Sequence, residues 1–171
     1  WIKEYGSLRE QGLPDGEEDF TAPAVIVDAA PRPLYVSRKV TNAAANLKHY
    51  ASKGLQGLVD AADMHVTITY SRSPVDWMKM GSAWDSKLAI EAGGPRLMEA
   101  FGPDKDTAVL SFASSNLKWR HDEMIEFGAS WDWPDYQPHV TIAYDFAGDI
   151  ESIEPWTGEI ILGPEIFEPI N

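Results

Sequence analysis

The chain contains two copies of the tetrapeptide His-Val-Thr-Ile, one starting at His65 and the other at His139, 74 residues apart. Imidazole accepts or donates a proton near neutral pH, so two histidines on opposite sides of one phosphate could act as general base and general acid. The hydroxyls of Thr67 and Thr141, two residues further along, could then bind the non-bridging phosphoryl oxygens. The repeat therefore predicts the two halves of one active site that cleaves a phosphodiester bond.

Each half of this pattern is weak evidence by itself, because threonine is common in strands and a lone histidine is usually structural. The matched pair favours catalysis, and either histidine could be the base. A paired-histidine metal site is the alternative, but no carboxylate stands at a His-x-x-x-His or His-Glu spacing. We therefore expect no metal and no cofactor. His49 and His121, the other two of the four histidines, lie on predicted helices, where we expect surface or packing roles.

Both copies read as strands, since apolar and polar residues alternate with period two. In the first copy, the side chains expected in the core are Met64, Val66, Ile68 and Tyr70. Those expected on the opposite face are His65, Thr67 and Thr69. The second copy repeats the alternation, so each histidine shares a face with its threonine.

Other elements surround these strands. In chain order the sequence predicts a strand over 33–40, a helix over 41–54 with Thr41 as N-cap and Gly54 at its end, two short strands around Gly93-Gly94-Pro95, a strand over 107–113, a helix over 114–128, and a last strand over 158–170. The order strand, helix, strand occurs twice. This pattern predicts an α+β fold with two similar lobes, each with a central strand and a helix, in a single domain over residues 34–171. Residues 1–33 read as an extended or irregular arm.

Composition limits the possible partners. With 171 residues, 44% hydrophobic, the chain can bury one sizeable core. It has no cysteine, which suits the cytoplasm, and no apolar run of the roughly 18 residues that a membrane span needs. A net charge of −13 disfavours a long nucleic acid, which usually binds a basic groove. A small phosphate ligand in a locally polar pocket remains compatible with that charge.

The paired motifs resemble those of the two-histidine (2H) phosphoesterases, which carry one His-x-Thr/Ser-x motif on the central strand of each of two pseudo-symmetric lobes. The resemblance spans most of residues 34–168. It implies antiparallel sheets around a central cleft, with the helices outside. Within that superfamily, the stretches RPLYVSRKVTNAA, MHVTITYSRSPVDWMKMG and YQPHVTIAYD are most similar to the phage anti-CBASS nucleases. This similarity implies a metal-independent phosphodiesterase that hydrolyses 3′–5′ linkages of cyclic di- or trinucleotide messengers and disables CBASS antiviral signalling in the host cytoplasm.

The same resemblance implies substrate-binding roles for two further residues. Tyr35 stands where those nucleases have an active-site tyrosine on the first strand, and Glu165 resembles an acidic residue that contacts substrate. Glu168 is close enough to be the match instead. Nucleotide bases stack on aromatic rings, so Trp77, Trp131 and Trp133, in loops next to the motifs, are expected base platforms. Each of these residues also has a structural alternative. Tyr35 could be an ordinary cross-strand aromatic, the two glutamates could be solvated carboxylates, and the tryptophans could belong to the core.

Two other functions fit the same residues. The first keeps the two-histidine chemistry but acts on RNA ends that carry 2′,3′-cyclic phosphates. The second is a non-catalytic, nucleotide-binding domain of a larger phage structural protein. The chain begins at Trp1 and not at Met, so we expect it to be a piece of a longer polypeptide.

Overall fold

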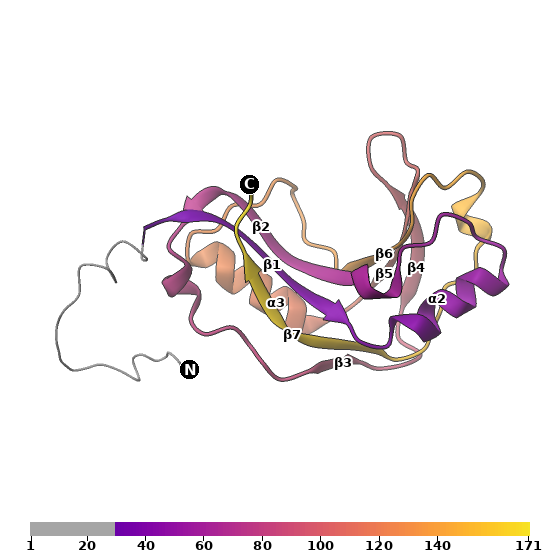
Figure 1. The fold of residues 1–171 in the computed structure, drawn as a ribbon, viewed down its shortest axis with the longest axis horizontal. Helices are drawn as coiled ribbons and strands as arrows, with labels where there is room; N and C mark the ends of the chain where they lie inside the picture. The colour runs from indigo at the N-terminus through magenta and orange to yellow at the C-terminus, as the bar shows by residue number, and fades with distance from the viewer. Residues whose placement is uncertain (1–29) are drawn as a thin grey trace.

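The computed structural model describes residues 30–171, so most of the predicted arm lies outside the described residues. Figure 1 shows an elongated α+β fold. Its elements in chain order are β1 (Arg32–Val40), α2 (Ala43–Ser52), η1 (Ala61–Asp63), β2 (His65–Val75), η2 (Trp77–Met80), β3 (Leu88–Ile90), β4 (Arg96–Phe101), β5 (Thr107–Phe112), α3 (Ser115–Glu126), β6 (His139–Ala143), η3 (Ile150–Ser152) and β7 (Ile160–Glu168). Every strand and helix that the sequence predicts after residue 32 is present.

The strands form two antiparallel sheets. The four-stranded sheet has the order β2-β1-β7-β3, and the three-stranded sheet has the order β4-β5-β6. β2 and β6, which carry the two repeated motifs, are therefore edge strands of different sheets, and they contact each other where the sheets meet. The predicted arrangement of antiparallel sheets with outer helices is confirmed.

Each sheet is covered by one helix, as predicted, but the two helices are exchanged, so that each packs on the sheet that carries the other motif. α2 follows β1 but packs on the three-stranded sheet, where the Tyr50 hydroxyl contacts Met98 Sδ of β4 at 3.2 Å. α3 follows β5 but packs on the four-stranded sheet, where Arg120 pairs with Glu165 of β7. β1 ends near the junction of the two sheets. The chain then continues as α2 over the three-stranded sheet before it returns as β2 (Figure 1).

Side chains fix where the helices begin. Ser114 caps α3, because its hydroxyl accepts a hydrogen bond from the backbone N–H of Leu117. The predicted cap of α2, Thr41, was wrong, because its hydroxyl donates to the Ile161 carbonyl and Asn42 occupies the N-cap position. The start of α2 is therefore tied to β7.

A β-bulge in β2 changes the predicted alternation of its side chains. Ser37 of β1 pairs with Thr67, but Val36 pairs with Thr69, so β2 contains one extra residue, Ile68. Ile68 and Thr69 are both fully buried, and Tyr70 lies on the other face. The predicted positions of Thr69 and Tyr70 were therefore wrong, because strict alternation holds only up to the bulge.

Candidate active site

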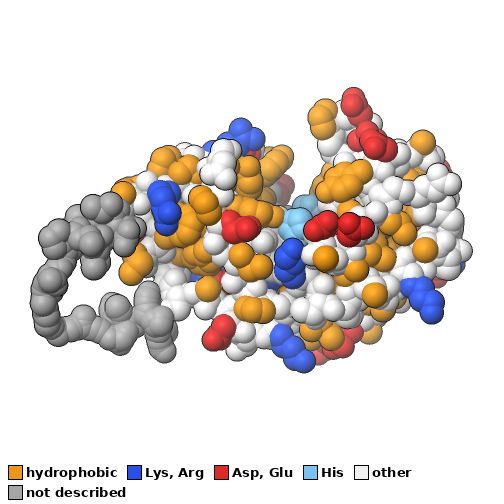
Figure 2. Space-filling view, viewed as in Figure 1, with side chains coloured by type: hydrophobic (Ala, Val, Ile, Leu, Met, Phe, Trp, Pro, Cys, Tyr) orange, Lys and Arg blue, Asp and Glu red, His pale blue; other side chains and the backbone are white. Residues whose placement is uncertain are grey.

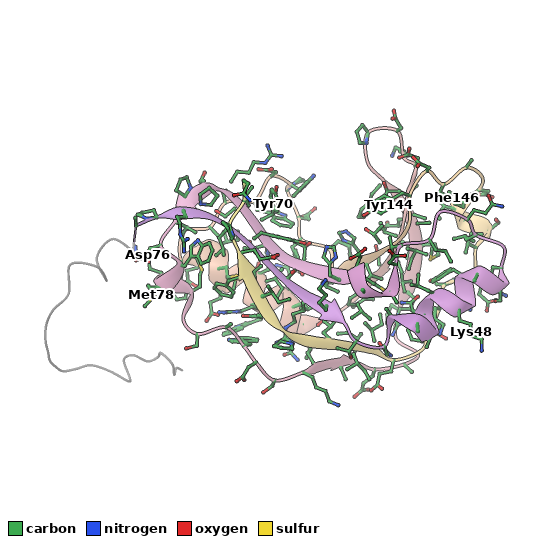
Figure 3. The ribbon with its side chains drawn as sticks, viewed as in Figure 1. Lys48, Tyr70, Asp76, Met78, Tyr144 and Phe146 are labelled. Carbon is green, nitrogen blue, oxygen red and sulfur yellow. The ribbon has the colours of Figure 1, made fainter. Side chains whose placement is uncertain are left out.

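The two motifs face one cleft between the sheets. Val66 and Ile68 of the first copy, and Val140 and Ile142 of the second, are 0% exposed in the core. Burial of these alternate residues turns each histidine and threonine toward the cleft, where all four are half-buried. Figure 2 shows a notch in the surface with histidine side chains at its floor, and Figure 3 shows Tyr70 and Tyr144 on its two sides. The predicted pairing of the repeats across a cleft agrees with this arrangement.

The rings of His65 and His139 are oriented by equivalent hydrogen bonds. Nδ1 of His65 lies 2.7 Å from the carbonyl oxygen of Asp63, and Nδ1 of His139 lies 2.9 Å from that of Gln137. A carbonyl oxygen only accepts, so each Nδ1 carries a proton and donates it. When the rings are neutral, each Nε2 therefore has a lone pair available for proton transfer.

The environments of the two histidines differ. Burial lowers the pKa of His139 below the ordinary imidazole value, and the charge of His65 lowers it further, while hydrogen bonding to Gln137 and the charge of Glu99 raise it in part. The charge of His65 acts on His139, so the two imidazoles lie near each other. At neutral pH, His139 is therefore predominantly a neutral proton acceptor.

Three residues that the sequence did not single out surround His139. Ser111 pairs with it across β5 and β6, and its hydroxyl donates to Glu99 Oε1 of β4 at 2.7 Å. The Phe101 ring lies 4.9 Å from the imidazole, edge to face. In the sequence, Ser111 and Glu99 are each a polar residue within a mostly apolar strand, which could have marked them as candidates. Only the pairing of the strands shows that they lie beside His139.

Tyr35 lies beside the first motif, as the resemblance implied. Its hydroxyl is 3.3 Å from Thr67 Oγ1, and its ring packs edge-on 6.3 Å from His65. Burial raises the pKa of Tyr35, the hydrogen bond to Thr67 lowers it in part, and the charge of Glu168 adds to the rise. The hydroxyl therefore stays protonated at neutral pH and can donate a hydrogen bond.

A cavity of about 390 Å³ opens between the motifs. Its lining residues are Leu58, Val59, Asp60, Asp63, Met64, His65, Thr141 and Tyr144. The wall formed by residues 58–64 depends on Gly57, which has φ +72° and sits so close to β6 that a Cβ would lie 2.5 Å from the Tyr144 carbonyl oxygen. The cavity joins a histidine of one motif to the threonine of the other.

The structure does not bring Glu165 to this cleft. Glu165 pairs with Arg38 across β1 and β7, so it lies on the face covered by α3, opposite to His65. Its carboxylate accepts hydrogen bonds from Arg120 at 2.9 and 3.0 Å, and the side chain is 0% exposed. Glu168, in contrast, pairs with Tyr35 and shares its face. Glu168 is exposed there, so it is the carboxylate of β7 that can reach a ligand in the cleft.

The three tryptophans have different surroundings. Trp77 is away from the cleft, where its ring stacks against the Arg32 guanidinium and its indole N–H donates to the Arg32 carbonyl. Trp131 is partly buried against His121, with ring centres 4.7 Å apart. Trp133 is 55% exposed and packs on Trp131, so its ring is the one that remains available to a ligand.

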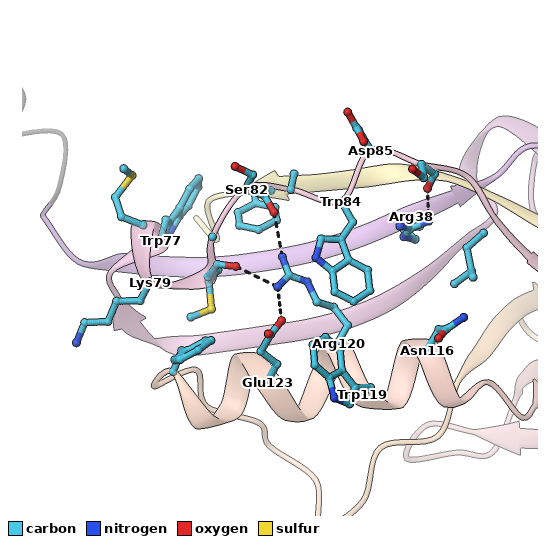
Figure 4. A pocket seen from close by; sticks show the side chains of 18 of the residues that line it. Arg38, Trp77, Lys79, Ser82, Trp84, Asp85, Asn116, Trp119, Arg120 and Glu123 are labelled. Carbon is cyan, nitrogen blue, oxygen red and sulfur yellow. Dashed lines mark hydrogen bonds and ion pairs between the residues drawn. The ribbon is translucent and has the colours of Figure 1, made fainter. Parts of the chain in front are cut away.

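A larger cavity, of about 1280 Å³, lies between α3 and residues 77–88 on the opposite side of the four-stranded sheet (Figure 4). Its buried cations are already paired. Arg38 donates to the Ser86 and Gly163 carbonyls, and Arg120 binds the carboxylates of Glu123 and Glu165. These contacts hold the structure together, and neither repeated motif reaches this cavity.

Within residues 30–171, no group of three or more histidine, cysteine, aspartate or glutamate side chains is placed to hold a metal ion. In the same range, no helix is both long and apolar enough to cross a membrane.

Comparisons with known proteins identify related sequences. Residues 32–171 match the family model described as "Anti-CBASS protein Acb1". The chain is 53% identical over 148 residues to the anti-CBASS protein Acb1 of Caulobacter sp. (strain RHG1), with 84% of this chain and 23% of the relative covered. It is 27% identical over 146 residues to that of Enterobacteria phage T4, with 81% of this chain and 88% of the relative covered. The chain thus spans about a quarter of the length of the Caulobacter relative.

Solved structures share the fold at low sequence identity. The crystal structure of E. coli LigT complexed with 3′-AMP has a TM-score of 0.55 and 13% identity, with 82% of this chain and 96% of LigT covered. A structure described as a phosphoesterase has a TM-score of 0.53 and 12% identity, with 80% of this chain and 87% of that chain covered. These likenesses concern the fold alone.

Proposed function

The chain belongs to the anti-CBASS protein Acb1 family, and on this basis we propose that it is a metal-independent phosphodiesterase that cleaves 3′–5′ linkages of cyclic di- or trinucleotide messengers. Such cleavage would disable CBASS signalling in the cytoplasm of an infected host. The observation that carries the proposal is the pair His65 and His139, whose Nδ1 atoms are both bound to backbone carbonyls so that Nε2 is available for proton transfer in one cleft.

The chemistry follows from these two rings. His139, whose pKa burial holds below the ordinary value, takes the proton from the ribose 2′-hydroxyl next to the scissile phosphate. The 2′-oxygen attacks phosphorus, the bond from phosphorus to the 5′-oxygen breaks, and His65 donates a proton to the departing 5′-oxygen. This step leaves a 2′,3′-cyclic phosphate on the opened molecule as an intermediate. The base is assigned to His139 because burial lowers its pKa, and the remaining histidine, His65, takes the role of the acid.

Hydroxyl groups bind the phosphoryl oxygens in this scheme. Thr67 and Thr141 face the cleft beside the histidines, and the neutral Tyr35 hydroxyl is within reach of Thr67. Donors held in place before the reaction stabilise the charge that develops on the phosphoryl group without further reorganisation. Removal of such a donor typically slows turnover by about 10² to 10³-fold.

A small cyclic substrate fits the size and charge of the cleft. The 390 Å³ cavity lies within the usual range of about 300–1,000 Å³ for small-molecule pockets. The net charge of −13 would repel a long polyanion that extends beyond the cleft. E. coli LigT, which shares the fold, has been crystallised with 3′-AMP, which supports a nucleotide as ligand. Glu168 and Trp133, both exposed, are the groups we propose for contacts with the bases.

The test is a comparison of kcat/KM for isomers of cyclic GMP–AMP, cyclic triadenylate and a linear RNA of ten nucleotides. We expect the cyclic substrates to be cleaved faster, with a 2′,3′-cyclic phosphate as intermediate and no cleavage at a linkage whose 2′-hydroxyl is absent. If the linear RNA is preferred by tenfold or more, the protein acts on RNA ends instead. If nucleotides bind but none is cleaved, the chain is a non-catalytic binding domain of a longer protein.

A further inference from the structure

The bulge in β2 places two consecutive carbonyl groups of the first motif against side chains from the second half of the chain. The Thr67 carbonyl oxygen accepts a hydrogen bond from the Tyr136 hydroxyl at 2.7 Å. The Ile68 carbonyl oxygen lies 2.7 Å from Nδ1 of His121, which must donate because the carbonyl only accepts. β2 is an edge strand, so side chains take the place of a neighbouring strand at this point.

Tyr136 and His121 form one rigid unit. Their rings are stacked in parallel, with centres 4.2 Å apart, and Trp131 packs edge-on against both. His121 is 4% and Tyr136 is 9% exposed, and the hydrogen bond from His121 is buried, so its loss would leave the Ile68 carbonyl without a partner in the interior.

The short segment that begins at Tyr136 touches both motifs. Tyr136 binds the carbonyl of Thr67, and the next residue, Gln137, supplies the carbonyl that orients His139. Upstream, the backbone N–H of Ser130 donates to the Ser71 hydroxyl, so residues 130–136 follow the outer side of β2. The position of Thr67 is therefore set relative to His139 through three peptide bonds.

We propose that Tyr136 and His121 are positioning residues that fix the bulge of β2 and thereby set the distance between the two His-x-Thr motifs. Neither residue is placed to touch the substrate. Both act through the backbone of Thr67 and Ile68, and the proposal rests on the phosphodiesterase function above. Reacting groups must be held close to their productive geometry, and a misplacement of about 1 Å can cost roughly 10²-fold in rate.

The first test is Tyr136→Phe, which removes one hydroxyl and keeps the stacked ring. We expect kcat to fall by about tenfold or more with KM changed less than about twofold, because alignment of the reacting groups is lost while binding contacts remain. The matched control is Tyr50→Phe. Tyr50 is also buried, and its hydroxyl also makes specific contacts, to Met98 Sδ and the Trp156 N–H, but on the far side of the three-stranded sheet from the motifs.

Tyr50→Phe should lower the melting temperature like Tyr136→Phe and leave kcat unchanged. An equal fall of kcat in both variants, or wild-type kcat in Tyr136→Phe, would show that Tyr136 serves stability alone.

At position 121, His121→Asn places an amide N–H near the site of Nδ1, whereas His121→Leu offers no donor. We expect Asn to retain more of kcat than Leu, and equal losses would contradict a role for the hydrogen bond to Ile68.

A readout without substrate separates this proposal from the proposed function. In Tyr136→Phe the backbone amide NMR signals of residues 65–69 and 139–141 should shift together, and in Tyr50→Phe they should stay in place. If the wild-type protein cleaves nothing but these shifts occur, the phosphodiesterase is refuted and the positioning is supported. If the signals of residues 65–69 do not move, the positioning is refuted whatever the activity.

Discussion

His65 and His139 are oriented by the same contact, in which Nδ1 donates to the carbonyl of the residue two positions earlier. The two copies of the tetrapeptide thus share a local geometry as well as a sequence. Each ring is held at a fixed tautomer before any ligand binds, which is the arrangement that proton transfer through Nε2 requires.

Replacement of either histidine should abolish most of the turnover. His65→Ala or His139→Ala removes a general acid or base, so we expect kcat for a cyclic dinucleotide to fall by at least about 10²-fold. Circular dichroism should show an intact fold, since both side chains face the cleft. His49→Ala is the control, because His49 lies on α2 and contacts the carbonyl of Glu154. A folded alanine variant with near-normal turnover would exclude the two-histidine mechanism.

Acidification should destabilise the folded protein before its carboxylates titrate. Burial lowers the pKa of His121 and of His139 below the value of 6.5 expected in the unfolded chain. Between the folded pKa and 6.5 the unfolded chain binds more protons, so the stabilisation is complete above 6.5 and is lost as the pH falls through the folded pKa. Urea denaturation between about pH 7.5 and pH 5.5 measures this loss.

The control for this pH dependence is His121→Asn, which keeps a donor for the Ile68 carbonyl but does not titrate. Its unfolding free energy should fall less steeply over the same pH range. Wild-type stability that rises on acidification would contradict the neutral, buried state of these imidazoles.

Activity should survive chelation. In residues 30–171, the donor groups needed for a metal ion do not converge, and the proposed proton transfers use imidazole alone. We therefore expect unchanged kcat in excess EDTA. Loss of activity that zinc or manganese restores would transfer support to a paired-histidine metal site.

Replacement of the two glutamates of β7 should have different effects, one on the stability of the fold and the other on substrate binding. Glu165→Gln breaks a buried ion pair with Arg120, whose side chain is 2% exposed, so the unfolding free energy should drop by about 3 kcal/mol. Glu168→Gln changes an exposed carboxylate on the face of Tyr35, so stability should stay within about 0.5 kcal/mol while KM rises. Thermal denaturation and steady-state kinetics on both variants test this, and a raised KM in a stable Glu165→Gln protein would reverse the assignment.

The motif strands could be predicted from the sequence, because the alternation of Val66 and Ile68 with His65 and Thr67 is a local property. The alternation failed at Thr69 and Tyr70, because the bulge depends on pairing with β1, which local patterning does not encode. Tyr70 thereby joins Tyr35 on the cleft face, with ring centres 5.4 Å apart.

Contacts between distant elements were harder to predict. Glu165 and Glu168 stand three residues apart in one strand, so alternation already places them on opposite faces, but only the register against β1 shows which of the two faces is the cleft. Trp131 and Trp133 stand two residues apart in one loop, yet the burial of Trp131 depends on α3. The positions of these residues depend on how the strands pair and how the helix packs, and neither can be read from a short stretch of sequence.

The exchange of helices has a consequence for how the chain could be divided. A cut in the exposed turn at Gly93-Gly94 would give one fragment with β1, α2, β2 and β3, and another with β4, β5, α3, β6 and β7. Each fragment would carry one His-x-Thr motif and the helix that packs on the sheet of the other motif, and β7 of the second fragment would still have to pair between β1 and β3 of the first. Neither could bury its apolar face alone, so both would remain inert when separate. Any chemistry that needs both motifs would therefore require the two pieces to reassemble.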